Sequence, residues 1–145
     1  MKKLVILLSW LIISTSVSAQ NETTLKGLEN LAKQGDLAAQ IELASAYRKG
    51  IGVTQNYKTA VKWYTLAAEQ GNALAQYNLG RLYYLGKGLP ENLVYAHMWA
   101  KQASSNGFEM GAELTELLTE LMTENQIEMA NRLGKECVIK KYKSC

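Results

Sequence analysis

Few residues of this chain have the side chains and the spacing that catalysis or metal binding requires. His97 is the only histidine, and Cys137 and Cys145 are the only cysteines. Together they could supply three zinc ligands, but the cysteines lie forty and forty-eight positions beyond the histidine, so convergence on one metal ion is not expected. We interpret His97 as a residue that packs between helices or lies on a helix surface. The chain is therefore predicted to have no catalytic residue, no metal site and no cofactor.

The carboxylates towards the C-terminus form a series rather than a pair. They recur at helical spacing, which is typical of a solvated helix face and not of a general acid–base pair. The series is Glu109, Glu113, Glu116, Glu120 and Glu124. Two glycine motifs, at 50–52 and 86–88, resemble phosphate-binding loops only superficially, because neither follows a predicted strand or carries the rest of such a signature.

The first nineteen residues have the layout of a cleaved secretory signal. Lys2 and Lys3 give a positive start, an apolar run follows, and Val-Ser-Ala at 17–19 places small residues where a signal peptidase reads them. The apolar run is far shorter than the about 20 residues that span a bilayer. We predict cleavage after Ala19 and a periplasmic or secreted mature protein. An uncleaved membrane anchor is the alternative.

The mature chain carries little net charge. The full chain is +3 at neutral pH, and two of these charges belong to the signal, which leaves about +1. Nucleic acid is not an expected partner, because it would require a basic stripe. No stable membrane insertion is expected after signal removal. The basic cluster Lys140, Lys141 and Lys143 is interpreted as solvated cations at a helix C-terminus, with binding to an anionic envelope surface as the alternative.

The strongest pattern in the chain is an internal repeat of thirty-six residues. Glycines, aromatic residues, asparagines and alanines all recur at this step. The matched positions include Tyr47 and Tyr83, Asn56 and Asn92, Trp63 and Trp99, and the glycines at 35, 71 and 107. A period of this length predicts stacked copies of one supersecondary unit. Such arrays usually present a surface to a partner.

Each copy is predicted to be a pair of helices. In the first copy, Asp36 caps a helix that runs to about Lys49, a glycine break follows, and Asn56 caps a second helix that stops at Gly71. The second copy repeats this order. Small alanines should let the helices approach closely, while the tryptophans fill the gaps between layers.

We therefore predict an all-α fold, an αα-hairpin repeat solenoid of about seven helices. A single domain covers 20–145: a half repeat, full repeats over 35–70 and 71–106, and a divergent pair over 107–145 that caps the C-terminal end. In this last pair, Thr123 and Gln126 form a capping box at the start of the final helix.

These residues resemble the Sel-one-like repeat family, a branch of the tetratricopeptide-like helical repeats. The second copy matches the family pattern at Ala75, Leu79, Gly80, Tyr83, Gly86, Gly88, Asn92, Ala96, Trp99, Ala103 and Gly107. The first copy departs from it at Ala44, where the family prefers glycine. The tail resembles that of short exported bacterial members. The resemblance implies a right-handed superhelix and a protein-interaction role, without identifying the partner.

The two cysteines are predicted to form a disulfide. They lie eight positions apart in a chain predicted to be exported, and an oxidising compartment favours pairing. A continuous helix would hold their Cα atoms about 12 Å apart, whereas a disulfide requires less than about 7 Å. The last helix should therefore stop near 141–142 and let the tail fold back. Free thiols are the alternative, although secreted members of the family pair cysteines at this separation.

The resemblance also implies that the first helix of each copy lines the concave side of the superhelix. The arc opposite the predicted core positions carries tyrosine and arginine, which are enriched at binding hot spots. We predict a partner-binding stripe of Ile41, Arg48, Tyr77, Arg81 and Tyr84. The alternative is that Tyr77 and Tyr84 pack on neighbouring helices.

We expect a non-catalytic interaction module or scaffold of the cell envelope that binds another protein or peptide on its concave face. A structural subunit that associates through its own concave face is a variant of this. The alternative is an envelope-ligand binder or hydrolase acting on peptidoglycan fragments or β-lactams, since some secreted relatives are described as acting on penicillin-type compounds. Serine β-lactam hydrolysis uses Ser-x-x-Lys, but Ser45 is followed three residues later by Arg48.

Overall fold

The computed structural model describes residues 24–145, and the signal predicted at 1–19 lies outside them. Seven helices and no strand lie within the described residues, which confirms the predicted all-α fold. The helices are 24–33, α2 (Leu37–Lys49), α3 (Tyr57–Ala68), α4 (Ala73–Leu85), α5 (Leu93–Ser105), α6 (Glu109–Leu121) and α7 (Glu124–Ile139).

Side-chain caps begin the helices at matched positions of the repeat. The Asp36 carboxylate accepts a hydrogen bond from the backbone N–H of Ala39 at 2.8 Å, which satisfies a donor that the first turn leaves free. Asn56, Asn72 and Asn92 cap α3, α4 and α5 in the same way. The predicted capping box of Thr123 and Gln126 begins α7. Local sequence therefore fixes where most helices start.

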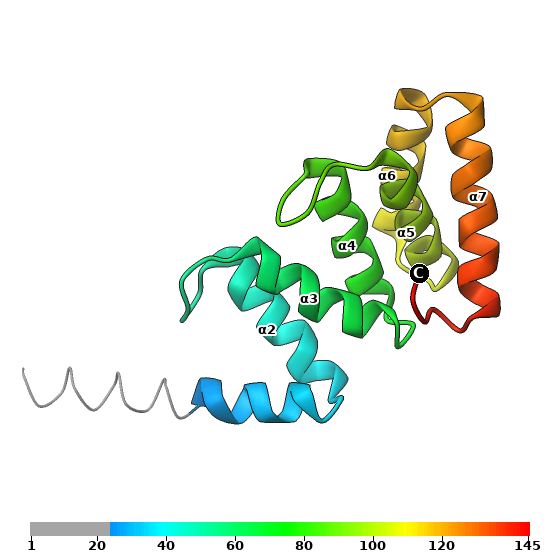
Figure 1. Ribbon diagram of the computed structural model, residues 1–145. Coiled ribbons are helices and arrows are strands. Elements are labelled where there is room, and N and C mark those ends of the chain that lie inside the picture. The colour runs from blue at the N-terminus through cyan, green and yellow to red at the C-terminus, as the bar shows by residue number, and fades with distance from the viewer. Residues whose placement is uncertain (1–23) are drawn as a thin grey trace, which may run out of the picture.

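The helices form two αα-hairpins followed by a different arrangement. α2 packs on α3, α3 on α4, and α4 on α5. At the C-terminal end α6 and α7 both pack on α5, so α7 does not pair with α6 as α3 pairs with α2 (Figure 1). From the end of α7 the chain turns back, and its C-terminus lies beside the lower end of α5 (Figure 1).

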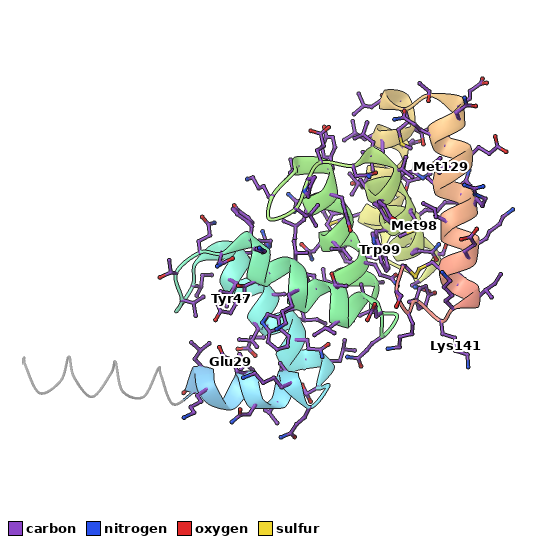
Figure 2. All side chains as sticks on the ribbon, viewed as in Figure 1. Glu29, Tyr47, Met98, Trp99, Met129 and Lys141 are labelled. Atoms are coloured by element: carbon purple, nitrogen blue, oxygen red, sulfur yellow. A yellow bond between two sulfur atoms is a disulfide. The ribbon has the colours of Figure 1, made fainter. Side chains whose placement is uncertain are left out.

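Close approach within each hairpin depends on small residues. Gly80 lies on α4 where it faces α5, and a Cβ there would come within 3.0 Å of the Ala96 carbonyl oxygen. Ala44 is fully buried at the matching position of α2. Trp63 and Trp99 are both buried at equivalent places, as predicted, and Figure 2 shows Trp99 and Met98 in the interior between the helices. Bulky rings and small side chains together make the dry core.

Buried amide side chains join successive layers by hydrogen bonds that follow the repeat. Gln40 Nε2 donates to the Ala32 carbonyl at 3.0 Å, and Gln76 Nε2 donates to the Ala68 carbonyl at 3.2 Å. Gln70 Nε2 donates to Gln40 Oε1, and Asn106 Nδ2 donates to Gln76 Oε1, both at 2.8 Å. These bonds satisfy amides that burial would otherwise leave unpaired, and they fix the register between layers.

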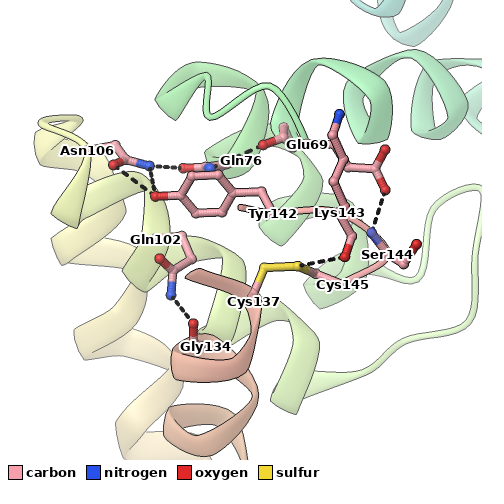
Figure 3. The surroundings of a disulfide bond; sticks show 11 residues. Glu69, Gln76, Gln102, Asn106, Gly134, Cys137, Tyr142, Lys143, Ser144 and Cys145 are labelled. Atoms are coloured by element: carbon pink, nitrogen blue, oxygen red, sulfur yellow. Dashed lines mark hydrogen bonds between the residues drawn. A yellow bond between two sulfur atoms is a disulfide. The ribbon is translucent and has the colours of Figure 1, made fainter. Parts of the chain in front are cut away.

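The C-terminal tail is folded back by the Cys137–Cys145 disulfide, whose Cα atoms lie 5.3 Å apart. α7 ends at Ile139, slightly before the predicted stop, and the tail then turns through left-handed residues (Figure 3). The Tyr142 hydroxyl hydrogen-bonds Asn106, and the Ser144 N–H donates to Glu69 Oε1 at 3.0 Å. The tail therefore ties the end of α7 to the region where α3 passes into α4.

Two matched glycines give a test of the packing between repeats. Gly52 and Gly88 both have left-handed backbones, with φ of 72° and 81°. A Cβ on Gly88 would lie 2.5 Å from the backbone of Tyr57, whereas a Cβ on Gly52 would meet nothing within 4 Å. We expect Gly52→Ala to cost about 1–2 kcal/mol of unfolding free energy from backbone strain alone, and Gly88→Ala to cost clearly more. Urea denaturation checks this, and equal losses would contradict the packing shown here.

A second test concerns the tail. Cys145→Ser removes the cross-link, and we expect the free energy of unfolding to fall by roughly 2–3 kcal/mol, because the reduced chain gains freedom when unfolded. Urea denaturation with and without a reductant measures the loss. Reductant should lower the wild-type midpoint to that of the variant and leave the variant unchanged. A wild-type midpoint that is insensitive to complete reduction would show that the tail is held without the disulfide.

Candidate interaction surface

The first two residues of the predicted stripe lie on α2 and are partly exposed. The Ile41 side chain is partly buried and packs against the hydrophobic core. Arg48 donates from Nε to the Tyr64 hydroxyl at 3.4 Å, a long hydrogen bond that holds the guanidinium near α3. Both side chains keep some surface that a partner could contact.

The remaining three residues of the stripe lie on α4. Tyr77 is only 9% exposed, and its ring packs against Phe108 with centroids 5.0 Å apart. The packing alternative therefore describes Tyr77. Arg81 lies over the Tyr77 ring at 5.7 Å, a cation–π distance, and Tyr84 is half-buried. The binding role of the partly exposed residues stays a prediction.

Sequence reasoning missed a set of exposed apolar side chains on the first helices. Five large ones are 40% to 52% exposed on α4 and α6: Leu74, Leu85, Met110, Leu117 and Leu121. Residues seven and eleven positions apart lie almost in line on a helix. The result is one line on each helix, which we call the first-helix stripe: Leu74, Arg81 and Leu85 on α4, and Met110, Leu117 and Leu121 on α6.

The repeat itself contained the signal for this stripe. The thirty-six-residue step takes Leu74 to Met110, Leu85 to Leu121 and Arg81 to Leu117. α4 and α6 contact each other, so the two lines belong to neighbouring helices. Tyrosine and arginine, the residue types enriched at binding hot spots, occur on this arc of α2 and α4 but not on α6, which carries methionine and leucine there. Matching exposed positions across copies would have extended the prediction to α6.

Acidic side chains lie beside the apolar line on α6. Glu109, Glu113, Glu116 and Glu120 are all exposed on α6, as predicted, whereas Glu124 is exposed at the start of α7 and does not belong to the same helix face. Within residues 24–145 the only side-chain ion pair joins Lys33 and Glu29, so none of the α6 carboxylates forms an ion pair with this part of the chain.

The C-terminal half also holds the histidine. His97 is 3% exposed on α5, and its Nε2 lies 3.1 Å from Thr119 Oγ1 on α6. Its Nδ1 is buried without a hydrogen-bond partner among the described residues. Burial, and secondarily the charge of Lys101, lower the pKa of His97 below its usual 6.5. His97 is thus a packing residue, one of the two roles predicted for it. No group of three potential metal ligands lies together in residues 24–145.

A chain of antiparallel helix pairs that repeats at thirty-six residues is an αα-hairpin repeat protein. The Sel1 repeat model matches residues 37–72 and 73–108. The protein belongs to the Sel1 repeat family. Proteins of this family generally mediate protein–protein interactions and are typically non-catalytic.

Two solved structures are similar to this chain. One is a protective antigen present in uropathogenic Escherichia coli strains, which displays an SLR fold; it is 34% identical, with a TM-score of 0.77, over 81% of this chain and 25% of that protein. The other is a Sel1 repeat protein from Oxalobacter formigenes, 32% identical, with a TM-score of 0.58, over 72% of this chain and 45% of that protein. This chain therefore corresponds to less than half of either. The comparison with curated proteins found no match.

The buried histidine predicts how stability depends on pH. Because its pKa is lower in the folded protein, the unfolded chain binds the proton first as pH falls. The free energy of unfolding should therefore decrease as pH drops through 6.5. His97→Gln, which keeps a donor for Thr119, should flatten the change between pH 7.5 and 5.5. Urea denaturation at both pH values measures it, and parallel decreases in wild type and variant would assign the effect to other groups.

Proposed function

We propose that this protein is an exported, non-catalytic interaction module of the cell envelope that binds another protein on the face formed by its first helices. The observation that best supports this proposal is the first-helix stripe, where apolar side chains are half exposed at matched positions of two neighbouring helices. Repeated exposure of large apolar side chains on one face is typical of interaction surfaces.

Three observations support a role in protein binding outside the cytoplasm. The family generally mediates protein–protein interactions. A disulfide closes the C-terminal tail, as suits a chain that folds in an oxidising compartment. Over residues 24–145, none of the helices combines the length and the apolar character needed to cross a membrane. We accordingly assign 1–19 to a cleaved signal and 20–145 to the interaction domain.

The charged and aromatic residues around the stripe would complete the interface. Arg81 lies within it, and Tyr84 lies half-buried beside it on α4. On α2, Ile41 and Arg48 would extend the same surface towards the N-terminal end. Tyr77 would act indirectly, because its buried ring makes a cation–π contact with Arg81 and so positions the Arg81 side chain.

Site-specific photo-crosslinking tests the assignment of this face. A benzophenone side chain at Tyr84 should crosslink to a distinct protein when the variant is expressed in its native cells. The matched control places the same group at Lys62, which is exposed on the second helix α3. We expect a heteromeric product from position 84 and at least a tenfold weaker one from position 62, because specific interfaces cover only a limited patch. Equal products from both positions, or none from either, would contradict the proposal.

A further inference from the structure

We propose that the partner presents a cationic amphipathic helix, which lies along the exposed side of α6. We call this side the α6 face; it consists of Met110, Leu117, Leu121 and the carboxylates Glu109, Glu113, Glu116 and Glu120. The inference rests on the proposed function and adds the chemistry of the partner.

The apolar part of the α6 face has the geometry of a helix-binding line. Met110, Leu117 and Leu121 are 46%, 44% and 52% exposed and run along the length of the 13-residue helix. A second helix packed alongside would bury this line against its own apolar face, as in other helix-in-groove complexes. The parallel line on α4, with Leu74 and Leu85, would widen the contact, because α4 and α6 are neighbours.

The charges of the α6 face decide the chemistry of the occupant. The four carboxylates follow one another along a single side of the apolar line. None has an ion-pair partner within the described residues. Lysine or arginine on the partner helix would supply the missing cations, and complementary charge sets both orientation and specificity.

The fold leaves a place for an additional helix at α6. In the two repeats the first helix carries Ala44 or Gly80 where it packs on its own second helix. The matching position of α6 is Glu116, and it is exposed, because α7 packs on α5 instead. A partner helix could therefore occupy a position comparable to that of the second helix in a complete repeat.

Two other occupants fit less well. An anionic lipid surface would be repelled by four adjacent carboxylates. A second copy offers an apolar and basic surface at the end of α7, where Val138 and Ile139 are exposed beside Lys140 and Lys141. That contact would join two different surfaces, which builds open chains unless a ring happens to close. The α6 face is therefore better suited to another protein.

The test uses a fluorescein-labelled helical peptide of leucine and lysine, as long as the 13-residue α6, with leucines on one face. A second peptide replaces each lysine by glutamate. Fluorescence anisotropy at low salt should show binding of the lysine peptide only. Leu117→Ser with Leu121→Ser should weaken that binding by about tenfold or more. The triple change Glu113→Gln, Glu116→Gln and Glu120→Gln should also weaken it severalfold and reduce its dependence on salt.

A matched control distinguishes binding at the α6 face from nonspecific binding to exposed apolar side chains. Leu31→Ser with Met129→Ser changes two side chains that are 49% and 46% exposed elsewhere, and binding should be unchanged. Circular dichroism must show equal helix content; if the leucine double variant unfolds, the glutamine triple variant decides the outcome. Equal binding to the double variant and the control, or equal binding of the glutamate peptide, would overturn the inference.

Two further results distinguish the possible failures. If wild type sediments as an oligomer that the leucine double variant dissociates, the occupant is a second copy and the inference is overturned. If the lysine peptide fails to bind while position 84 still crosslinks to a distinct protein, the partner is not cationic in the proposed way, and the proposed function stands. If both fail, the proposed function fails as well.

Discussion

The fold depends on close approach of paired helices at one position of each repeat. Ala44 on α2 and Gly80 on α4 leave so little space that a Cβ on the glycine would press on the α5 backbone. That contact brings Trp63 and Trp99 into the gaps beside it, where large rings bury much apolar surface. Because the same contact recurs every thirty-six residues, the layers stack at a constant step. The helix caps and the glycine breaks then set where each helix starts and ends, so that the paired helices can make this contact.

The repeat ends where this contact is no longer possible. Glutamate at position 116 could not be buried against a second helix without losing its hydration, which costs far more than a methyl group gains. α6 still packs on α5 through Gly111, whose missing side chain lets the backbones meet. α7 is therefore free to dock on α5 rather than on α6. Glu116 and the short connection to α7, which lacks the glycine cap of α2 and α4, both mark the end of the regular repeat, and an acidic, half-apolar side of α6 is exposed.

Much of this architecture could be predicted because its signals are local. The caps at Asp36 and Asn56, the box at Thr123 and the folding back of Cys145 each depend on a few neighbouring residues. The docking of α7 could not be predicted, since no repeat pattern describes it. Burial of Tyr77 was foreseen only as an alternative, because a tyrosine on the outer arc of an isolated helix becomes core only when another residue covers it, here Phe108 at the N-cap of α6. The exposed leucines could not be recognised by residue type, because leucine is more often a core residue than an exposed one, and only the matched positions of the repeat distinguish them.

The C-terminal tail shows how the last layer is closed without another repeat. Asn106 donates to Gln76 as Gln70 donates to Gln40, so the chain of amide bonds reaches the last repeat intact. At the matching position of the first repeat, Gln70 donates to Gly35 as well as to Gln40. Asn106 instead hydrogen-bonds the Tyr142 hydroxyl of the tail. The disulfide holds Tyr142 there by fixing the turn after α7 (Figure 3). The tail therefore stabilises this end on one side of α5, while the side of α6 that carries the carboxylates is left uncovered within the described residues.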